Sequence, residues 1–401
     1  MLAGKIGWAL AAAEKEDKAE EDVLASMNKG ILRRMVHDYE GSNRILEIAK
    51  KQIEALHGVS VSEQLGAVTV NDTLRSFSGD RYEQVLLHAY MAMNYLEMNN
   101  MDAARVEILQ ADIKMREWGD QPEEDPFVRY LSGMIYEALG ERDQAIVAYR
   151  QAKEVYQSTL EKQKTGIPLV LKKDLLRTLS AEGLWDEYKN LKQRLGLTKF
   201  RPKKPHKNFG ELVVILSNGL APVRGENSIM TYSNEMSDTL RIALPTYPNK
   251  PGHLYQARLV TSGATVQLET VEDIDSLARR ALEDDIPLIT ARALARAVVK
   301  HKTQGEAEER GGPLVGFLAT VANVASERAD TRSWTTLPQE IQVARIFLPS
   351  GPQPIRIDMV NGSGAVVDTI EEVVDIRPGK MAFVTKHWTS PHMDLKLVEE
   401  K

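Results

Sequence analysis

The chain has 401 residues and a formal net charge of −6, and 43% of its residues are hydrophobic while 27% are charged. This length suggests two or three domains of ordinary globular composition, and the acidic balance argues against nucleic acid as a partner. The chain has no cysteine, which excludes disulfides, thiol catalysis and thiolate metal sites within it.

The N-terminal segment MLAGKIGWALAAAEKED combines one lysine with a short apolar run from Ile6 to Ala13. Two interpretations fit it: a cleaved signal peptide, whose apolar region has the minimum length, and the start of a helix, which we favour. No apolar run reaches the roughly 18 to 20 residues that a membrane-spanning helix needs. The longest run, Leu314 to Ala325, is rich in small residues and predicts a buried helix.

Residues 1–198 are predicted to form an all-α domain, because apolar residues recur at helical intervals and proline falls between helical runs. Two segments within it share one internal spacing of small and large positions. These positions are Ala92, Tyr95, Ala104, Ile108 and Ala111 in the first segment, and Gly133, Tyr136, Ala145, Tyr149 and Ala152 in the second. Small residues at such points let two antiparallel helices approach closely, and the larger residues fill the space between them. The pattern resembles the tetratricopeptide repeat; the alternative is a generic helical bundle.

A weaker copy of the repeat has Gly30, Ser42, Leu46 and Ala49 at the same spacing, and a final helical hairpin is expected to turn at Gly183. In tetratricopeptide folds the first helix of each repeat lines a concave surface. The resemblance implies that the groove residues here are Met27, Ile31, Ala89, Met93, Leu96, Tyr130, Met134 and Glu137, with Arg34 at one end. Methionine-rich surfaces repack around different peptides or helices. Two alternatives stay open: a groove that binds a partner, and a groove that the chain fills with a helix from an inserted segment or from its second domain.

The segment 199–207, KFRPKKPHK, is basic and contains proline, and it ends the helical half. We interpret it as a solvated linker in preference to a patch for anionic lipid or another polyanion. Residues 208–337 are predicted to be α+β. Strands are expected at 211–217, 239–245 and 254–260, and helices at 271–283, 290–302 and 313–327.

Residues 338–401 are predicted to form a small antiparallel, sandwich-like β unit with turns at Asn361-Gly362 and Pro378-Gly379. The segment that enters this unit, ERADTRSWTTLP, is interpreted as a structural joint in preference to a catalytic or binding loop. Asp330 is a residue type that bonds nearby backbone amides, Arg332 can bridge to it, and Trp334 offers a large apolar surface.

The sequence contains no GxSxG, P-loop, GxGxxG, HExxH or EF-hand motif, and its one SxxK match, Ser26 to Lys29, lies within the weak repeat and is interpreted as chance. It predicts no cofactor and no metal site. Its eight histidines are scattered, and no pair has ligand spacing on a helix. Ser217 follows an apolar strand, where a nucleophile elbow would lie, but Ile215 stands where the elbow needs glycine. The pair Asn218-Gly219 is also typical of a tight turn. We therefore predict that the protein is not an enzyme.

Three longer stretches, NDTLRSFSGDRYEQVLLHAYMAMNYLEMNNMDAARVE, GELVVILSNGLAPV and ADTRSWTTLPQEIQVAR, resemble an uncharacterised family of predicted envelope lipoproteins of Gram-negative bacteria. The resemblance covers nearly the full length, and it implies a tetratricopeptide-like N-terminal half, a periplasmic or envelope location, and protein partners that include envelope or peptidoglycan-synthesis proteins. The resemblance implies no catalytic residue in this chain. This chain lacks the family's lipobox cysteine, so either the sequence starts after it or this member has no lipid anchor.

The function expected from these features is a non-enzymatic scaffold or adaptor that binds protein partners through its tetratricopeptide-like domain. Membrane association is expected only through a lipid anchor outside this sequence. Two alternatives are a subunit of a large envelope assembly and a hydrolase-type enzyme with its site in the second half. Binding to nucleic acid is not expected.

Overall fold

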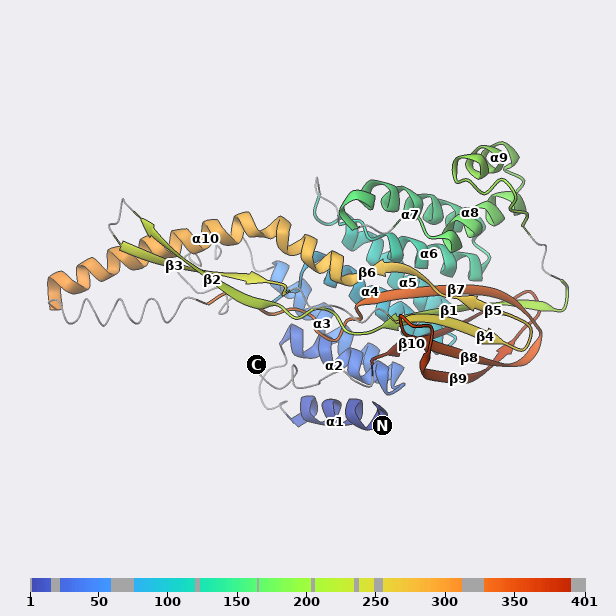
Figure 1. Ribbon diagram of the computed structural model, residues 1–401, viewed down its shortest axis with the longest axis horizontal. Helices are drawn as coiled ribbons and strands as arrows, with labels where there is room; N and C mark the ends of the chain where they lie inside the picture. Colours follow the sequence, from blue (N-terminus) through green and yellow to red (C-terminus); the bar gives the residue numbers. More distant parts are fainter. Residues whose placement is uncertain are drawn as a thin grey trace.

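The structure is a computed structural model of the chain. It describes residues 2–15, 22–58, 76–119, 123–163, 166–202, 206–233, 238–248, 255–311 and 328–390. A layer of helices, two packed sheets and a long arm make up the molecule (Figure 1).

The described part of the first 198 residues is built of helices. They are α1 (Leu2–Lys15), α2 (Val23–Met35), α3 (Tyr39–Gly58), α4 (Arg81–Glu97), α5 (Met101–Arg116), α6 (Pro126–Leu139), α7 (Arg142–Gln163), α8 (Leu169–Ala181) and α9 (Trp185–Arg194). From α2 onward, successive helices pair as the hairpins α2–α3, α4–α5, α6–α7 and α8–α9. The predicted all-α half made of helical repeats is confirmed.

The small residues at the start of the repeat spacing are required by close helix packing. A Cβ atom on Gly133 would lie 2.3 Å from ring carbons of Tyr149, and one on Gly30 would lie 2.5 Å from the Leu46 side chain. In both hairpins the close neighbour is the large residue that the repeat spacing predicts, so the pattern describes real helix contacts.

The second half contains two four-stranded sheets. The inner sheet has the order β10-β1-β7-β6, from β10 (Met381–Trp388), β1 (Phe209–Asn218), β7 (Glu340–Pro349) and β6 (Glu269–Asp273). The outer sheet has the order β5-β4-β8-β9, from β5 (Thr265–Gln267), β4 (Gln256–Thr261), β8 (Gly351–Val360) and β9 (Val366–Ile376). Strand β10 runs parallel to β1, whereas β7 runs antiparallel to it.

Strand β1 is buried on both of its faces, because successive side chains of a strand point in opposite directions. Val213 and Ile215 join the hydrophobic cluster of the helices. Leu212, Val214 and Leu216 join a second cluster between the inner and outer sheets. The inner sheet is therefore the middle layer of three.

The strands contact the first helix of each hairpin, namely α2, α4, α6 and α8. Of the second helices, α7 also reaches the inner sheet, where the Tyr156 hydroxyl donates to the Val271 carbonyl of β6 at 2.5 Å. The concave side of the repeats is thus turned toward the inner sheet.

Two predictions for the second half are wrong. Residue 338 does not divide two separate units, because β7 and β10 flank β1 in one sheet and β8 pairs with β4 in the other. The predicted helices at 271–283 and 290–302 are one helix, α10 (Ile274–Gly311), which continues through Pro287 and begins only after β6. The helix predicted at 313–327 lies outside the described residues.

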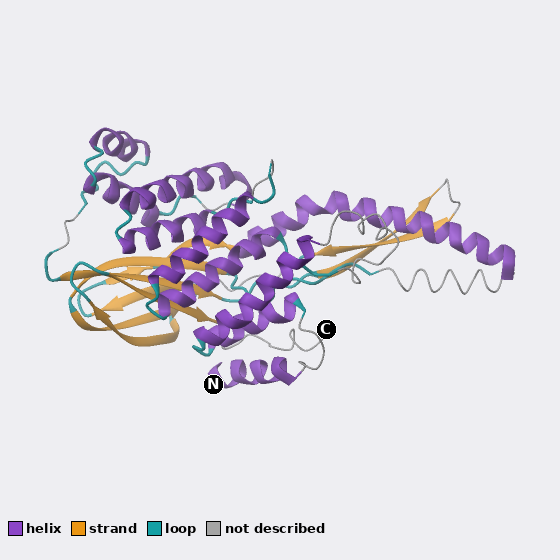
Figure 2. Ribbon diagram, turned by 180° about the vertical axis from the view of Figure 1, so that it is seen from behind, coloured by secondary structure: helices purple, strands orange, loops and turns teal. Residues whose placement is uncertain are grey.

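The arm consists of α10 and a two-stranded ribbon formed by β2 (Gly225–Ser233) and β3 (Asp238–Thr246). At the usual rise of about 1.5 Å per residue, a helix of this length extends for roughly 55 Å. The ribbon runs alongside α10 and contacts it through β3, and both project well beyond the sheets (Figures 1 and 2). No helix in the part of the chain that the structure describes is long and apolar enough to span a membrane.

Candidate functional site

The groove residues predicted from the repeats are inside the protein. Their exposed fractions are 0% for Met27, Ile31, Ala89, Met93, Tyr130 and Met134, and 2% for Leu96. Glu137 is largely buried as well, and both of its carboxylate oxygens bond arginine side chains. The prediction of an open partner-binding groove is wrong. The second half of the chain fills the groove, as the alternative proposed, but the alternative expected a helix there and the occupant is a sheet.

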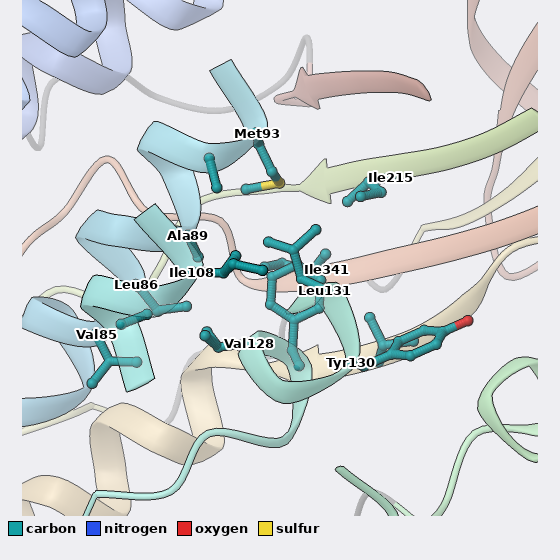
Figure 3. Packing of buried hydrophobic residues seen from close by; sticks show 14 of the residues in the cluster. Val85, Leu86, Ala89, Met93, Ile108, Val128, Tyr130, Leu131, Ile215 and Ile341 are labelled. Carbon is teal, nitrogen blue, oxygen red and sulfur yellow. The ribbon is translucent and has the colours of Figure 1, made fainter. Parts of the chain in front are cut away.

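The inner sheet occupies the groove. Met93 of α4 and Leu131 of α6 converge on Ile341 of β7, with Ile215 of β1 beside them (Figure 3). All four side chains belong to one hydrophobic cluster that runs without interruption from the helices into the strands. Opening the groove to a peptide would require this sheet to leave and its apolar face to enter water.

A buried arginine fixes the polar end of this contact. Arg345 of β7 has a side chain that is only 4% exposed, and it forms ion pairs with Asp174 of α8 at 2.8 Å, Glu211 of β1 at 2.9 Å and Glu137 of α6 at 3.2 Å. One guanidinium thus joins two helical hairpins to two strands. The groove position Glu137 serves this contact, and it is turned away from solvent.

Further hydrogen bonds complete the cluster. Tyr130 donates to Asp174 at 2.6 Å, Tyr149 donates to Glu137 at 2.8 Å, and Arg177 also pairs with Glu137. Burial alone would raise the pKa of Glu137, but the guanidinium groups of Arg345 and Arg177 lower it to about 2. Glu137 is therefore ionised at neutral pH, as its ion pairs require.

The other end of the groove is polar too. Arg34 of α2 is buried, donates to Thr385 of β10 at 2.6 Å, and lies 5.7 Å from the ring centroids of Tyr39 and Tyr90. The amide of Thr385 in turn donates to Glu97 at the end of α4. Both edges of the helix–sheet contact are therefore fixed by directional bonds, which determine the position and orientation of the sheet against the helices.

The segment 328–338 contacts α4 and leads into β7. Arg332 pairs with Asp330 at 2.6 Å, and Trp334 is 1% exposed with its ring 6.0 Å from that of Tyr90. The sequence did not reveal the partner of this segment: the amide of Trp334 donates to Glu83 of α4 at 2.7 Å. Burial raises the pKa of Glu83 to about 7.

A pair of buried carboxyl groups lies where α6 meets β6. Asp125 caps α6 by accepting from the Val128 amide at 2.8 Å, and Glu272 lies at an irregular register in β6. Each has one buried oxygen with no hydrogen-bond partner, and the charge of Asp125 disfavours the ionisation of Glu272. Burial and the neighbouring charge therefore favour protonated carboxyl groups at this place. Burial raises the pKa of Asp125 to about 6, and it raises that of Glu272 well above its ordinary value.

The residues considered for catalysis form no reactive site. Ser217 is 1% exposed, and its hydroxyl oxygen lies 3.1 Å from that of Tyr90 inside the helix–sheet contact. A substrate therefore has no access to it. Across the described ranges, no cluster of three histidine or acidic side chains is arranged to hold a metal ion.

One feature of the sequence indicates this buried ion cluster. Arg345 interrupts the apolar strand sequence IQVARIFLP at a position whose neighbours alternate between two buried faces. A charge there indicates a buried ionic partner, because an unpaired charge is too costly inside. Identifying that partner required the structure, since Glu137 lies 208 residues earlier in the chain.

Comparisons with known proteins add little to this description. No protein-family model and no curated protein matches the sequence. Among solved structures, the Rap conjugation gene regulator of the plasmid pLS20 in complex with the Phr* peptide is similar over 49% of this chain and 48% of its own, at 15% identity and a TM-score of 0.30. The similarity therefore covers about half of each protein.

The filled groove predicts a large difference between two methionine substitutions. Met93→Glu places a charge at a 0% exposed position and is expected to unfold the protein or to lower its stability by more than about 3 kcal/mol. Met230→Glu, at a position 67% exposed, is the matched control and is expected to be nearly neutral. Thermal melting followed by circular dichroism compares them. Equal melting temperatures would show that the groove is open in solution.

The carboxyl pair predicts that stability falls as the pH rises. In the unfolded chain both groups ionise near pH 4, whereas the folded protein keeps them protonated to a higher pH. The contribution of Asp125 is present below its unfolded pKa and is lost as the pH passes about 6, its pKa in the folded protein. The contribution of Glu272 is lost as the pH rises through its own raised pKa. The melting temperature should therefore drop by several degrees between pH 5 and pH 8, to which the raised pKa of Glu83 adds.

Glu272→Gln removes the ionisable group and keeps the size of the side chain. We expect this variant to flatten the pH dependence of the melting temperature. Glu371→Gln, on the exposed side of β9, is the control and should retain the wild-type slope. A Glu272→Gln profile that parallels the wild type would contradict a raised pKa of Glu272 as a source of the pH dependence.

Proposed function

We propose that the protein is a non-enzymatic scaffold or adaptor of the bacterial cell envelope, and that it binds protein partners through its arm. The proposal rests on which apolar surfaces the fold buries and which it leaves exposed. The chain's own sheet occupies the groove in which tetratricopeptide-like proteins hold peptides. The arm projects from the body (Figure 1), and it carries exposed apolar side chains.

The arm is a thin structure that leaves apolar surface uncovered. Ile229 and Met230 on β2 are 50% and 67% exposed, and Leu288 and Leu294 on α10 are 51% and 42% exposed. One helix can cover only one face of a two-stranded ribbon, and such a ribbon is marginal without further packing. Exposed apolar groups gathered on a projection are typical of protein-binding surfaces, and methionine adapts its shape to a partner.

The root of the arm is held firmly to the body. Arg224 at the start of the ribbon pairs with Asp80, the N-cap of α4, and donates to the Tyr247 hydroxyl at 3.0 Å. Arg279 of α10 donates to the Tyr247 carbonyl at 2.9 Å and lies 5.8 Å from the centre of its ring. These contacts fix the direction of the arm relative to the helices, as a scaffold that presents a binding surface requires.

The envelope location rests on the family resemblance of the sequence. The three stretches that carry it include β1 and the joint that enters β7, which are parts of the buried centre of the fold. Members of that family look like predicted lipoproteins of Gram-negative bacteria, which supports partners among envelope or peptidoglycan-synthesis proteins. The burial of Ser217 supports the non-enzymatic part of the proposal, because a hydrolytic nucleophile must be reachable.

Crosslinking from the arm in intact cells tests the proposal. A photoreactive residue in place of Met230 should give discrete adducts with one or a few envelope proteins. The same residue in place of Val373 on β9 is the matched control, since both positions are 67% exposed, and should give none.

Two outcomes would contradict the proposal. One is an adduct pattern at Met230 that is absent or identical to the pattern at Val373. The other is hydrolysis of ester or peptide substrates by the purified protein that disappears in Ser217→Ala.

A further inference from the structure

The outward face of α5 carries a continuous apolar stripe. Val106, Leu109 and Ile113 are 51%, 38% and 66% exposed, and their spacing of three and four residues places them on one side of the helix. The opposite side of α5, with Ile108 and Ala111, is buried against its own hairpin partner. The stripe is thus a second apolar face, one that packing among the described residues does not use.

The repeats provide an internal comparison for this stripe. The same three positions in the flanking outer helices are Arg44, Glu47 and Lys51 in α3, and Val147, Arg150 and Glu154 in α7. Repeat packing therefore does not require apolar residues there, because the equivalent helices hold mostly charged ones. The apolar residues on the exposed side of α5 therefore serve a purpose other than the packing of the repeats.

Charges of opposite sign lie at the two ends of the stripe. Asp102, Val106, Leu109, Ile113 and Arg116 follow one another at intervals of four, three, four and three, the spacing of a coiled-coil seam. Arg116 is 62% exposed, and it makes an ion pair of 3.0 Å with Asp112 on its own helix. The seam positions therefore begin with an acidic side chain and end with a basic one, and the basic one would have to exchange its bond to Asp112 for a carboxylate of a partner.

We propose that this α5 seam is a self-association surface, on which a second copy of the chain packs its own α5 antiparallel around a two-fold axis. In that arrangement Asp102 of each copy lies beside Arg116 of the other, and the apolar stripe of one copy covers that of the other. A parallel arrangement would place like charges together. A two-fold axis needs only one self-complementary patch, and a seam whose halves are opposite in charge is such a patch.

The dimer is expected to be weak, because one short helix buries less than the roughly 800 Å² per partner of standard stable interfaces. We expect a dissociation constant on the order of 100 μM. The proposal does not depend on the arm or on its partners, since α5 lies in the helical layer and the arm leaves from the opposite half of the sequence.

Sedimentation equilibrium of the full chain, over concentrations from about 10 to 500 μM, tests the proposal. The wild type should shift from monomer toward dimer as its concentration rises. Ile113→Glu should weaken association by at least tenfold. Val373→Glu, at a position 67% exposed against 66% for Ile113, is the matched control and should associate like the wild type. Circular dichroism establishes that each variant is folded.

A charge exchange tests the antiparallel geometry. Asp102→Arg alone should weaken association several-fold, and adding Arg116→Asp should restore it. A wild-type chain that stays monomeric at every concentration overturns the proposal and leaves the stripe to a helix of another protein. Equal association of Ile113→Glu and Val373→Glu, or a double exchange that fails to restore association, also overturns it.

Discussion

The fold depends on one contact, in which the inner sheet fills the concave side of the helical repeats. The hydrophobic cluster of the helices includes Val213 and Ile215 of β1, Ile341 and Val343 of β7, and Phe383 of β10. Arg345 anchors this contact through three carboxylates that come from two helices and a neighbouring strand. The two halves of the chain are thus one cooperative structure, and neither half could expose its side of the contact to water without a large loss of stability.

This contact changes what the helical repeats do in this protein. In an open repeat domain the first helices present a binding surface, whereas here they serve as one wall of the core. The surfaces left for other molecules are the outer helices, the outer sheet and the arm. The arm root and the joint meet at the same place, because Arg224 pairs with Asp80 and also donates to the Arg332 carbonyl at 3.3 Å. A load on the arm would therefore act directly on the joint between helices and sheet.

Local features of the fold could be predicted from the sequence, and distant contacts could not. The spacing that pairs Gly133 with Tyr149 describes neighbours within one hairpin, and it was correct because such contacts depend only on helix geometry. The Asp330–Arg332 pair and the burial of Trp334 also followed from local chemistry. The occupant of the groove could not be predicted, because an apolar surface has the same sequence pattern whether it binds a peptide or a strand of its own chain.

The order of the strands and the single long helix of the arm could not be predicted from the sequence either. Strand β10 lies parallel to β1 although their sequences are far apart, so the last strands looked like a unit of their own. Helix α10 continues through Pro287, where a proline usually ends or kinks a helix.

Native-state hydrogen exchange in Arg345→Ala tests the central claim most directly. Removing one partner from a buried ion cluster costs about 3 to 5 kcal/mol, and in a single cooperative unit this loss reaches every element of the contact. The account predicts that the opening free energies of amides in α4, α6 and β1 fall by similar amounts. A fall confined to the strands, with α4 amides as protected as in the wild type, would show that the helical half is stable by itself and would contradict the account.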